Sequence, residues 1–419
     1  MARIAANSAR SRLHPRMKRD ASEQLALDRG TPAVDSPAMV QVVNTLSRSD
    51  GGPARHALEV NFALNNAGAK VQLLSVHPET DDCVLGEMRD RVDFPELSPQ
   101  FLRPATLRSY GRRLMQVARS ERLILHGYFL WWVPVLTAWA RLCNVPVFVM
   151  PHGALTAYDR SKSRAKKNLF VLLGGGWLVD RVARFVVASE MELSELPRTI
   201  ARSRVNVVGA GAEPPESTPD VSRPLNNPVR LLTLSRVAPK KRIDLAISAV
   251  AKLRDAGVDA ELVVAGTGLA AHLQELKRLA SADGVESQVT FSGAVGGTDK
   301  AELLRWADIF VLPSEDENFG LALAEAAMHA IPAVVSDRVG AAMHMPSSAG
   351  ARLTAPTPTT IADAVRALAG RYGSARKSAR EFARAEFSWT EVGARWMTAL
   401  GAQTQSASAA PSTVPSEGR

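Results

Sequence analysis

The stretch Ile309–Gly340, IFVLPSEDENFGLALAEAAMHAIPAVVSDRVG, predicts a strand, an acidic loop, a helix and a second strand in succession. Ile309–Leu312 is a short apolar run, which is typical of a buried parallel strand. Asn318–Gly320 then opens a segment of strong helix formers, and Pro332 is expected to end that helix before Ala333–Ser336 resumes as a strand. Because the first N–H groups of a helix lack intrahelical partners, this helix start favours binding of a phosphate group.

Two carboxylates bracket the predicted helix start: Glu317 lies in the loop, and Glu325 lies in the helix eight positions later. A carboxylate has two acceptor oxygens and can accept from both hydroxyls of a vicinal diol. Taken singly, Glu317 is better explained as a solvated loop charge and Glu325 as a charge on the helix surface. Together, around one phosphate-binding helix start, they favour a site that holds a sugar on one side and a ribose on the other.

The string EDENFGLALAEA resembles the E-x7-E signature of retaining glycosyltransferases of family 4. The resemblance extends from about Met39 to Leu400 and implies an α/β protein with the GT-B fold. In that fold two Rossmann-like domains face each other across a cleft, and a C-terminal helix crosses back to the first domain. The implied reaction moves a sugar from a nucleotide diphosphate sugar to an acceptor hydroxyl with retention of configuration. The departing phosphate helps to deprotonate the acceptor, so no protein nucleophile is required.

A proline-rich polar break, EPPESTPDVSRPLNNP, is the predicted linker between the two domains. The first residues are polar and Arg-rich and lack the apolar core of a secretory signal, so we expect a disordered tail; a misplaced start codon is the alternative. The predicted divisions are a basic tail over 1–37, an acceptor domain over 38–212, the linker over 213–228, a donor domain over 229–385, the crossover helix over 386–400 and a disordered tail over 401–419.

The turn SRVAPKKR follows the first predicted strand of the donor domain. In the family the equivalent turn supplies an Arg and, five residues later, a Lys to the donor diphosphate, which correspond here to Arg236 and Lys241. Two fixed cations would stabilise the negative charge that develops as the nucleoside diphosphate departs. Arg242 stands where the family commonly has Gly, and Lys240 is an alternative to Lys241.

His152 follows the predicted strand Val145–Met150, at the end of a parallel strand where such sheets bind ligands. A lone histidine there is more often structural, but the string PHG-x-L resembles the family motif whose histidine faces the donor sugar. The resemblance therefore predicts a catalytic set of His152, Glu317, Arg236 and Lys241. It predicts donor contacts from Gly51, Gly52, Arg236, Lys241, Gly266, Val295, Glu317, Asn318, Phe319, Gly320, Leu321 and Glu325.

The string GTGLAA, which begins at Gly266 after a predicted strand, matches G-x-G-x-x-A and raises a nicotinamide-binding unit as an alternative. The next predicted strand, Val289–Phe291, ends in Ser-Gly and not in the acidic residue that would take a ribose. We therefore interpret this turn as the one that borders the nucleotide base in the family.

The chain carries a net charge of +9, which favours an anionic partner. The run RSKSRAKK is most simply a solvated face, but beside the acceptor it could hold an anionic lipid headgroup or a lipid-linked diphosphate. No nucleic-acid-binding motif is recognisable. We predict a cytoplasmic protein, peripheral on the inner face of the membrane, that modifies a lipid-linked or surface polysaccharide precursor. The predicted acceptor or membrane contacts are Arg160, Lys162, Arg164, Lys166 and Lys167.

No His, Cys or acidic group has the spacing of a metal site, so we predict metal-independent activity without a cofactor. Cys83 and Cys143 are interpreted as buried thiols in a reducing compartment. The donor base, uridine or guanosine, stays open. The alternatives are a catalytically weak GT-B relative that acts as a binding partner subunit, a GT-B nucleotide-sugar epimerase, or a hydrolase. The string VVGAG at Val207–Gly211, in place of the family's P-N-G turn, keeps the first of these open.

Overall fold

The computed structural model describes residues 38–46, 52–77, 100–101, 114–156, 159–160 and 164–402. The predicted tail over 1–37 lies outside these residues, as does the C-terminal tail beyond Ala402. Gly51, Cys83 and Lys162 also lie outside them, and the side chains of Arg164 and Lys166 are not described.

The first sheet has seven parallel strands in the order β3-β2-β1-β4-β5-β6-β7. Apolar runs form its central strands, which are buried along most of their length because helices cover both faces. The strands are β1 Met39–Val43, β2 Val71–Ser75, β3 Gln100–Phe101, β4 Arg122–His126, β5 Val147–Met150, β6 Arg184–Val187 and β7 Val205–Val207. The helices are α2 Gly52–Asn66, α5 Trp132–Leu142, α7 Arg164–Leu172, α8 Gly175–Val182 and α9 Glu190–Glu195.

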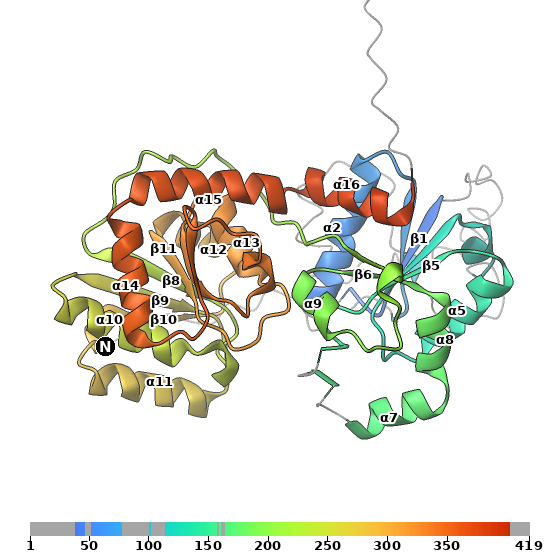
Figure 1. The fold of residues 1–419 in the computed structure, drawn as a ribbon, viewed down its shortest axis with the longest axis horizontal. Helices are drawn as coiled ribbons and strands as arrows, with labels where there is room; N and C mark the ends of the chain where they lie inside the picture. Colours follow the sequence, from blue (N-terminus) through green and yellow to red (C-terminus); the bar gives the residue numbers. More distant parts are fainter. Residues whose placement is uncertain are drawn as a thin grey trace, which may run out of the picture. The chain divides into compact units, whose positions relative to one another are not determined.

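The second sheet has six parallel strands in the order β10-β9-β8-β11-β12-β13 (Figure 1). Its strands are β8 Val229–Leu234, β9 Ala260–Ala265, β10 Val289–Gly293, β11 Ile309–Leu312, β12 Ala333–Ser336 and β13 Gly350–Leu353. The α-helices are α10 Ile243–Asp255, α11 Ala270–Ala282, α12 Gly297–Trp306, α13 Leu321–Met328, α14 Pro358–Ala369, α15 Tyr372–Phe387 and α16 Trp389–Leu400. Two parallel sheets with crossover helices confirm the predicted fold class.

The helix predicted after Gly320 ends earlier than the sequence suggested. α13 stops at Met328, and Ala330 takes a left-handed φ of 59° before Pro332 is reached. The Ile331 N–H donates back to the Ala326 carbonyl at 3.0 Å, which closes the last turn. The proline therefore begins the approach to β12 and does not itself end the helix.

The two C-terminal helices connect the second sheet to the first (Figure 1). α15 packs on α13, and α16 packs on α2, as the resemblance predicted. Gly393 makes the second contact close, because a Cβ at that position would lie 3.2 Å from the Ala63 carbonyl oxygen of α2. The guanidinium of Arg122, on β4, donates to the carbonyls of Leu400 and Gly401 and so binds the end of α16.

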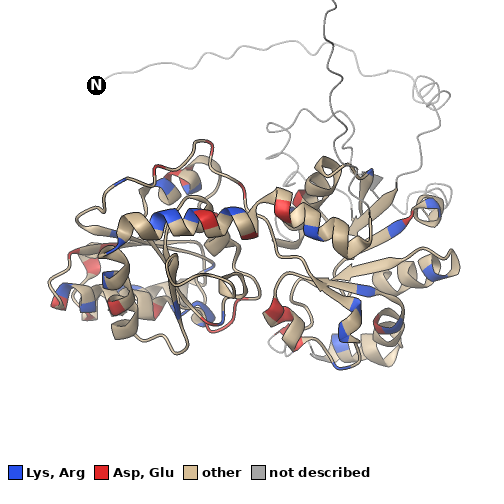
Figure 2. Cartoon of the chain, turned by 45° about the horizontal axis from the view of Figure 1, so that its top comes forward, with Lys and Arg blue, Asp and Glu red and all other residues tan. Residues whose placement is uncertain are grey.

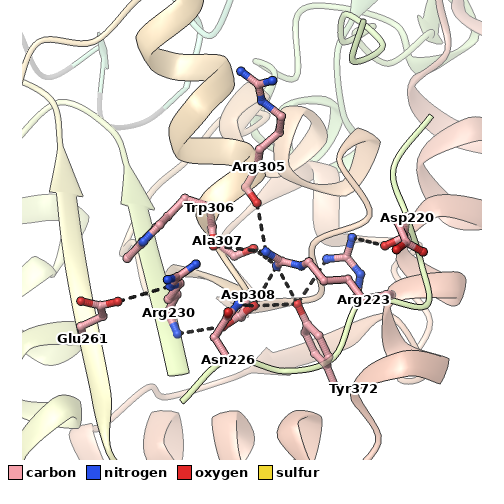
Figure 3. Close-up of polar contacts among 11 residues, drawn as sticks. Asp220, Arg223, Asn226, Arg230, Glu261, Arg305, Trp306, Ala307, Asp308 and Tyr372 are labelled. Atoms are coloured by element: carbon pink, nitrogen blue, oxygen red, sulfur yellow. Dashed lines mark hydrogen bonds and ion pairs between the residues drawn. The ribbon is translucent and has the colours of Figure 1, made fainter. Parts of the chain in front are cut away.

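The segment before β8 is fastened to the second sheet by a buried carboxylate, Asp308, which directly precedes β11 (Figure 3). Its Oδ1 accepts hydrogen bonds from Arg223 at 2.7 Å, Asn226 at 2.8 Å and the Tyr372 hydroxyl at 2.8 Å. Its Oδ2 accepts from the Arg230 N–H at 3.0 Å. Part of the predicted linker is therefore anchored on the second sheet, and the proposed domain boundaries stay predictions.

Candidate active site

The start of α13 depends on Gly320, whose φ of 97° lies in the left-handed region. A Cβ there would also lie 2.8 Å from Val339 Cγ1, so a larger residue would be both strained and crowded. Glu317 lies in the loop before the helix, where its N–H donates to the Arg338 carbonyl and its carbonyl accepts from the Gly340 N–H. The backbone around Glu317 is thereby held by the segment that follows β12.

The two predicted groups Lys241 and Glu317 lie together: the Lys241 ammonium donates to Glu317 Oε2. A second lysine, Lys240, pairs with Asp316 at 2.9 Å. The backbone joins the same two loops, because the Glu315 N–H donates to the Lys240 carbonyl at 2.8 Å. The turn after β8 and the acidic loop after β11 therefore form one charged site at the carboxyl end of the sheet, where such sheets bind ligands.

Burial, together with the positive charges of Lys240 and Arg236, lowers the pKa of Lys241 to about 8. Arg236 is exposed, and it lies near enough for its charge to lower the pKa of Lys241. Arg242 has a left-handed φ of 50°, which explains why a glycine is common at this position in the family. In this chain Asp244 and Glu315 hold the Arg242 guanidinium by ion pairs at 2.9 Å each.

Glu325 has a partner that the sequence did not indicate. The Lys300 ammonium, on α12, donates to Glu325 Oε1 at 2.7 Å, and both side chains are about one-fifth exposed. Lys300 follows the predicted base-binding turn, in which Val295 is half-buried. Each glutamate of the E-x7-E pair is thus matched by a lysine from another element of the same domain.

His152 lies in a strained loop after β5, with a φ of 53° followed by a φ of 78° at Gly153. The buried carboxylate of Glu192 holds this loop by accepting from the Gly153 N–H at 2.7 Å. Glu192 also accepts from the Ala188 N–H at 3.0 Å and the Asn318 side chain at 3.4 Å. Burial raises its pKa against these hydrogen bonds. Glu192 therefore links the His152 loop to the residues before α13, a role that the sequence analysis did not predict.

Two further histidines, His126 and His56, surround His152. His126 Nδ1 lies 3.0 Å from His152 Nε2, and the centroids of the His56 and His152 rings are 5.4 Å apart. Burial lowers the pKa of His126 to about 3 and of His56 to about 4, and it lowers that of His152 well below its ordinary value. All three imidazoles are therefore neutral at neutral pH.

The glycine turn after β9 has a packing explanation that does not require a nicotinamide cofactor. A Cβ on Gly266 would lie 1.8 Å from the Ser235 carbonyl oxygen, and one on Gly268 would lie 2.0 Å from the Val237 carbonyl oxygen. The glycines thus allow the turn after β8, which carries the predicted diphosphate cations, to pass directly over this turn.

Two sequence profiles match the chain: one covers the first sheet from β2 to β7, and the other covers the second sheet. The profile "Glycosyl transferase 4-like domain" matches residues 51–211, and "Glycosyl transferases group 1" matches residues 216–385. The chain belongs to the group 1, family-4-like glycosyltransferases.

Curated relatives of this family member include a GDP-mannose-dependent alpha-(1-6)-phosphatidylinositol dimannoside mannosyltransferase of Mycobacterium tuberculosis. It is 33% identical over 180 residues, which are 42% of this chain and 45% of that protein. A D-inositol 3-phosphate glycosyltransferase 2 of Catenulispora acidiphila is 32% identical over 227 residues, 50% of each chain. The match spans about half the length of these relatives.

A solved structure of Anabaena Alr3699/HepE in complex with UDP and glucose has the same fold. Its TM-score is 0.66 at 15% identity, and the match covers 88% of this chain and 100% of that one. The GT-B fold of this family member is therefore established. Within the part of the chain that the structure describes, no helix is long and apolar enough to cross a membrane.

The turn that departs from the family's P-N-G pattern has a structural reason in this member. A Cβ on Gly211 would lie 2.3 Å from the indole ring of Trp389, at the start of α16. Trp389 in turn makes an edge contact with His56, with ring centroids 6.0 Å apart. Gly211 thus makes room for an indole ring that packs against His56.

A cavity of about 250 Å³ lies beside the E-x7-E loop and is lined by residues of both domains. Phe319 is the only predicted donor residue in its wall, which also includes Ser189, Gly340 and His344. The charged residues predicted to contact the donor, Arg236, Lys241, Glu317 and Glu325, do not line this cavity.

Proposed function

We propose that this protein transfers a hexose from a nucleotide diphosphate sugar to an acceptor hydroxyl, with retention of configuration and without a required metal ion. The observation that carries the proposal is the start of α13. Glu317 and Glu325 flank it, and each is paired with a lysine, Lys241 or Lys300. Helix amides, cations and paired carboxylates at the carboxyl end of one sheet suit the binding of a sugar diphosphate. Hydrolysis of a glycosidic bond would instead need two carboxylates that face one bond.

In the proposed reaction the bound donor separates the lysine–glutamate ion pairs, and each of these side chains then binds a group of the donor. Its diphosphate takes the ammonium of Lys241 and the guanidinium of Arg236, which stabilise the leaving group. Glu317 is then free to accept from the sugar hydroxyls, together with the amides of the Phe319–Gly320 turn, and Glu325 accepts from the ribose diol. His152 would lie near the reacting carbon. The leaving phosphate assists removal of the acceptor proton, so the protein supplies positioning and electrostatic stabilisation.

The donor base is the first property to measure. The mycobacterial relative is named as GDP-mannose-dependent, whereas HepE was solved with UDP and glucose, at an identity that shows the fold alone. We would titrate the purified chain with GDP-mannose and UDP-glucose by calorimetry in the presence of a chelator. Binding of one nucleotide class, lost in Lys241→Ala, would support the proposal. Failure of both to bind would favour the partner-subunit alternative, and conversion of a bound sugar without an acceptor would favour an epimerase.

Glu325→Gln should weaken donor binding about tenfold, because the amide keeps the shape but loses the charge-assisted bond to a ribose hydroxyl. Lys300→Met, which removes the partner of Glu325, should have a smaller effect, since the carboxylate remains. Calorimetric titration of the nucleoside diphosphate alone measures both. Glu302→Gln, an exposed change on the same helix as Lys300, is the control. Unchanged affinity in Glu325→Gln would remove Glu325 from the ribose site.

We further propose that the acceptor is presented at an anionic membrane surface. Large apolar side chains are exposed around α5, α7 and α8, at Trp131, Val135, Leu142, Leu169, Val171, Leu172, Leu173 and Trp177. Lys167 lies on α7 and Arg160 shortly before it in the sequence, and the charged residues of the chain are coloured in Figure 2. Exposed aromatic and aliphatic groups next to basic ones are typical of a surface that binds a lipid interface.

Neutralising the basic run should reduce binding to vesicles that contain anionic lipid at least about tenfold, because each basic residue near such a surface contributes ~1 kcal/mol. Sedimentation with phosphatidylglycerol vesicles at low and high salt measures the effect. The changes are glutamine at Arg160, Lys162, Arg164, Lys166 and Lys167. The control variant carries five exposed changes on the second domain, at Lys252, Lys277, Arg278, Lys377 and Arg384. An equal loss in the two variants would mean that net charge, not this surface, determines binding.

A further inference from the structure

Three histidines that are far apart in the sequence meet at the carboxyl ends of the central strands β4 and β5 of the first sheet. His56 lies on α2, His126 ends β4 and His152 follows β5. One ring nitrogen from each lies within 4.8 Å of one from each of the others. The positions 56, 126 and 152 have no metal-site spacing, so only the fold brings them together.

The group holds buried nitrogens that lack hydrogen bonds. His56 is 4% exposed, and neither of its ring nitrogens has a partner among the described residues. His126 is 2% exposed; its Nδ1 contacts His152, and its Nε2 has no partner among those residues. Buried polar atoms of native proteins are nearly always satisfied, so unpartnered imidazoles that share one site indicate a ligand.

The geometry fits a small cation with nitrogen ligands. A tetrahedral ion with metal–nitrogen bonds of about 2.0–2.1 Å requires nitrogens about 3.3 Å apart. His126 Nδ1 and His152 Nε2 are 3.0 Å apart, and a ring nitrogen of His56 lies within 4.8 Å of the other two ligand nitrogens. Neutral imidazoles without a carboxylate or thiolate among them suit zinc, copper, nickel or cobalt and do not suit magnesium or calcium.

We propose that His56, His126 and His152 form a binding site for a late first-row divalent metal ion of the Zn²⁺ type. Three protein ligands leave a fourth position for water. The ion would replace the hydrogen bond between His126 and His152 and would hold the His152 ring. One consequence rests on the proposed function. A bound ion would inhibit sugar transfer, because the His152 ring would no longer be free to face the donor.

The test uses the full chain after treatment with chelator and its removal. Titration with Co²⁺, followed by calorimetry and by the visible absorption of four-coordinate cobalt, should give one bound ion per chain. Competition with Zn²⁺ should abolish the absorption, and Mg²⁺ should not. Absence of a bound Co²⁺ ion in the unaltered protein would overturn the proposal without any variant.

Substitutions then identify the ligands. His56→Gln and His126→Asn should each weaken Co²⁺ binding at least about a hundredfold, since loss of supporting groups alone weakens metal sites 10- to 100-fold. His272→Gln, which removes a surface histidine paired with Glu275, should leave binding unchanged. Unchanged binding in the first two variants would overturn the site. These measurements need no nucleotide sugar, so they stand even if the proposed transferase activity fails.

Discussion

Replacing Lys241 by alanine should lower kcat/KM for sugar transfer at least about a hundredfold, the size of effect seen when a fixed group that stabilises developing charge is removed. Lys241 is 6% exposed, and its ammonium contacts Glu317 at the point where the turn after β8 meets the loop before α13. The buried position makes the charge effective, because little water screens it. Steady-state kinetics with the donor identified by calorimetry measures this loss.

Lys241 also predicts a pH dependence. Its pKa is lowered to about 8, so the ammonium is present below pH 8 and is lost as the pH rises through that value. Affinity for the nucleoside diphosphate should therefore fall between about pH 7 and pH 9, the window around that pKa. Lys241→Arg should flatten this fall, because a guanidinium stays charged throughout.

Lys240 provides the matched comparison, because it is adjacent in sequence and pairs with Asp316 at 2.9 Å. Lys240→Ala should reduce kcat/KM less than Lys241→Ala and should keep the fall in affinity near pH 8. The reverse order of effects would assign the diphosphate contact to Lys240. Equal, small effects in both variants would remove this turn from the transfer reaction.

Local sequence patterns were sufficient to predict the two strands that flank α13 and the helix start at Gly320. Ile309–Leu312 and Ala333–Ser336 form strands with the predicted bounds, because short apolar runs between breakers have few other solutions in an α/β chain. The E-x7-E spacing places Glu325 within the first two turns of α13, beside the helix start. These features depend on residues that are near one another in the sequence, so a local sequence pattern is enough to predict them.

The partners of the predicted residues could not be found in this way. Lys300 meets Glu325 across two helices, and Glu192 meets Asn318 across two domains. The two members of each pair are far apart in the sequence, and only the order of the strands in the fold brings them together. The three histidines show the same limit, since their positions suggested no metal site.

Asp308→Ala should produce the largest loss of stability among the changes considered, about 3–5 kcal/mol, because removal of one partner leaves a buried charge uncompensated. Asp308 is fully buried and accepts from Arg223, Asn226 and Tyr372 on one oxygen and from the Arg230 N–H on the other (Figure 3). Equilibrium unfolding in urea, followed by the fluorescence of the tryptophans, measures the change. Asp363→Ala removes a surface pair with Arg366 at 3.6 Å and should cost at most about 1 kcal/mol.

A second substitution separates the charge from the packing. In Asp308→Ala the Arg223 guanidinium keeps its bonds to the Ala307 and Arg305 carbonyls but loses its ion-pair partner. Arg223→Met added to Asp308→Ala should therefore recover part of the lost stability, because the unpaired charge is gone. If the stability losses of the single variants Asp308→Ala and Arg223→Met simply add in the double variant, the network acts through packing of the 213–228 segment and not through the buried ion pair. Recovery would show that one carboxylate fixes this segment against the sheet that carries the donor site.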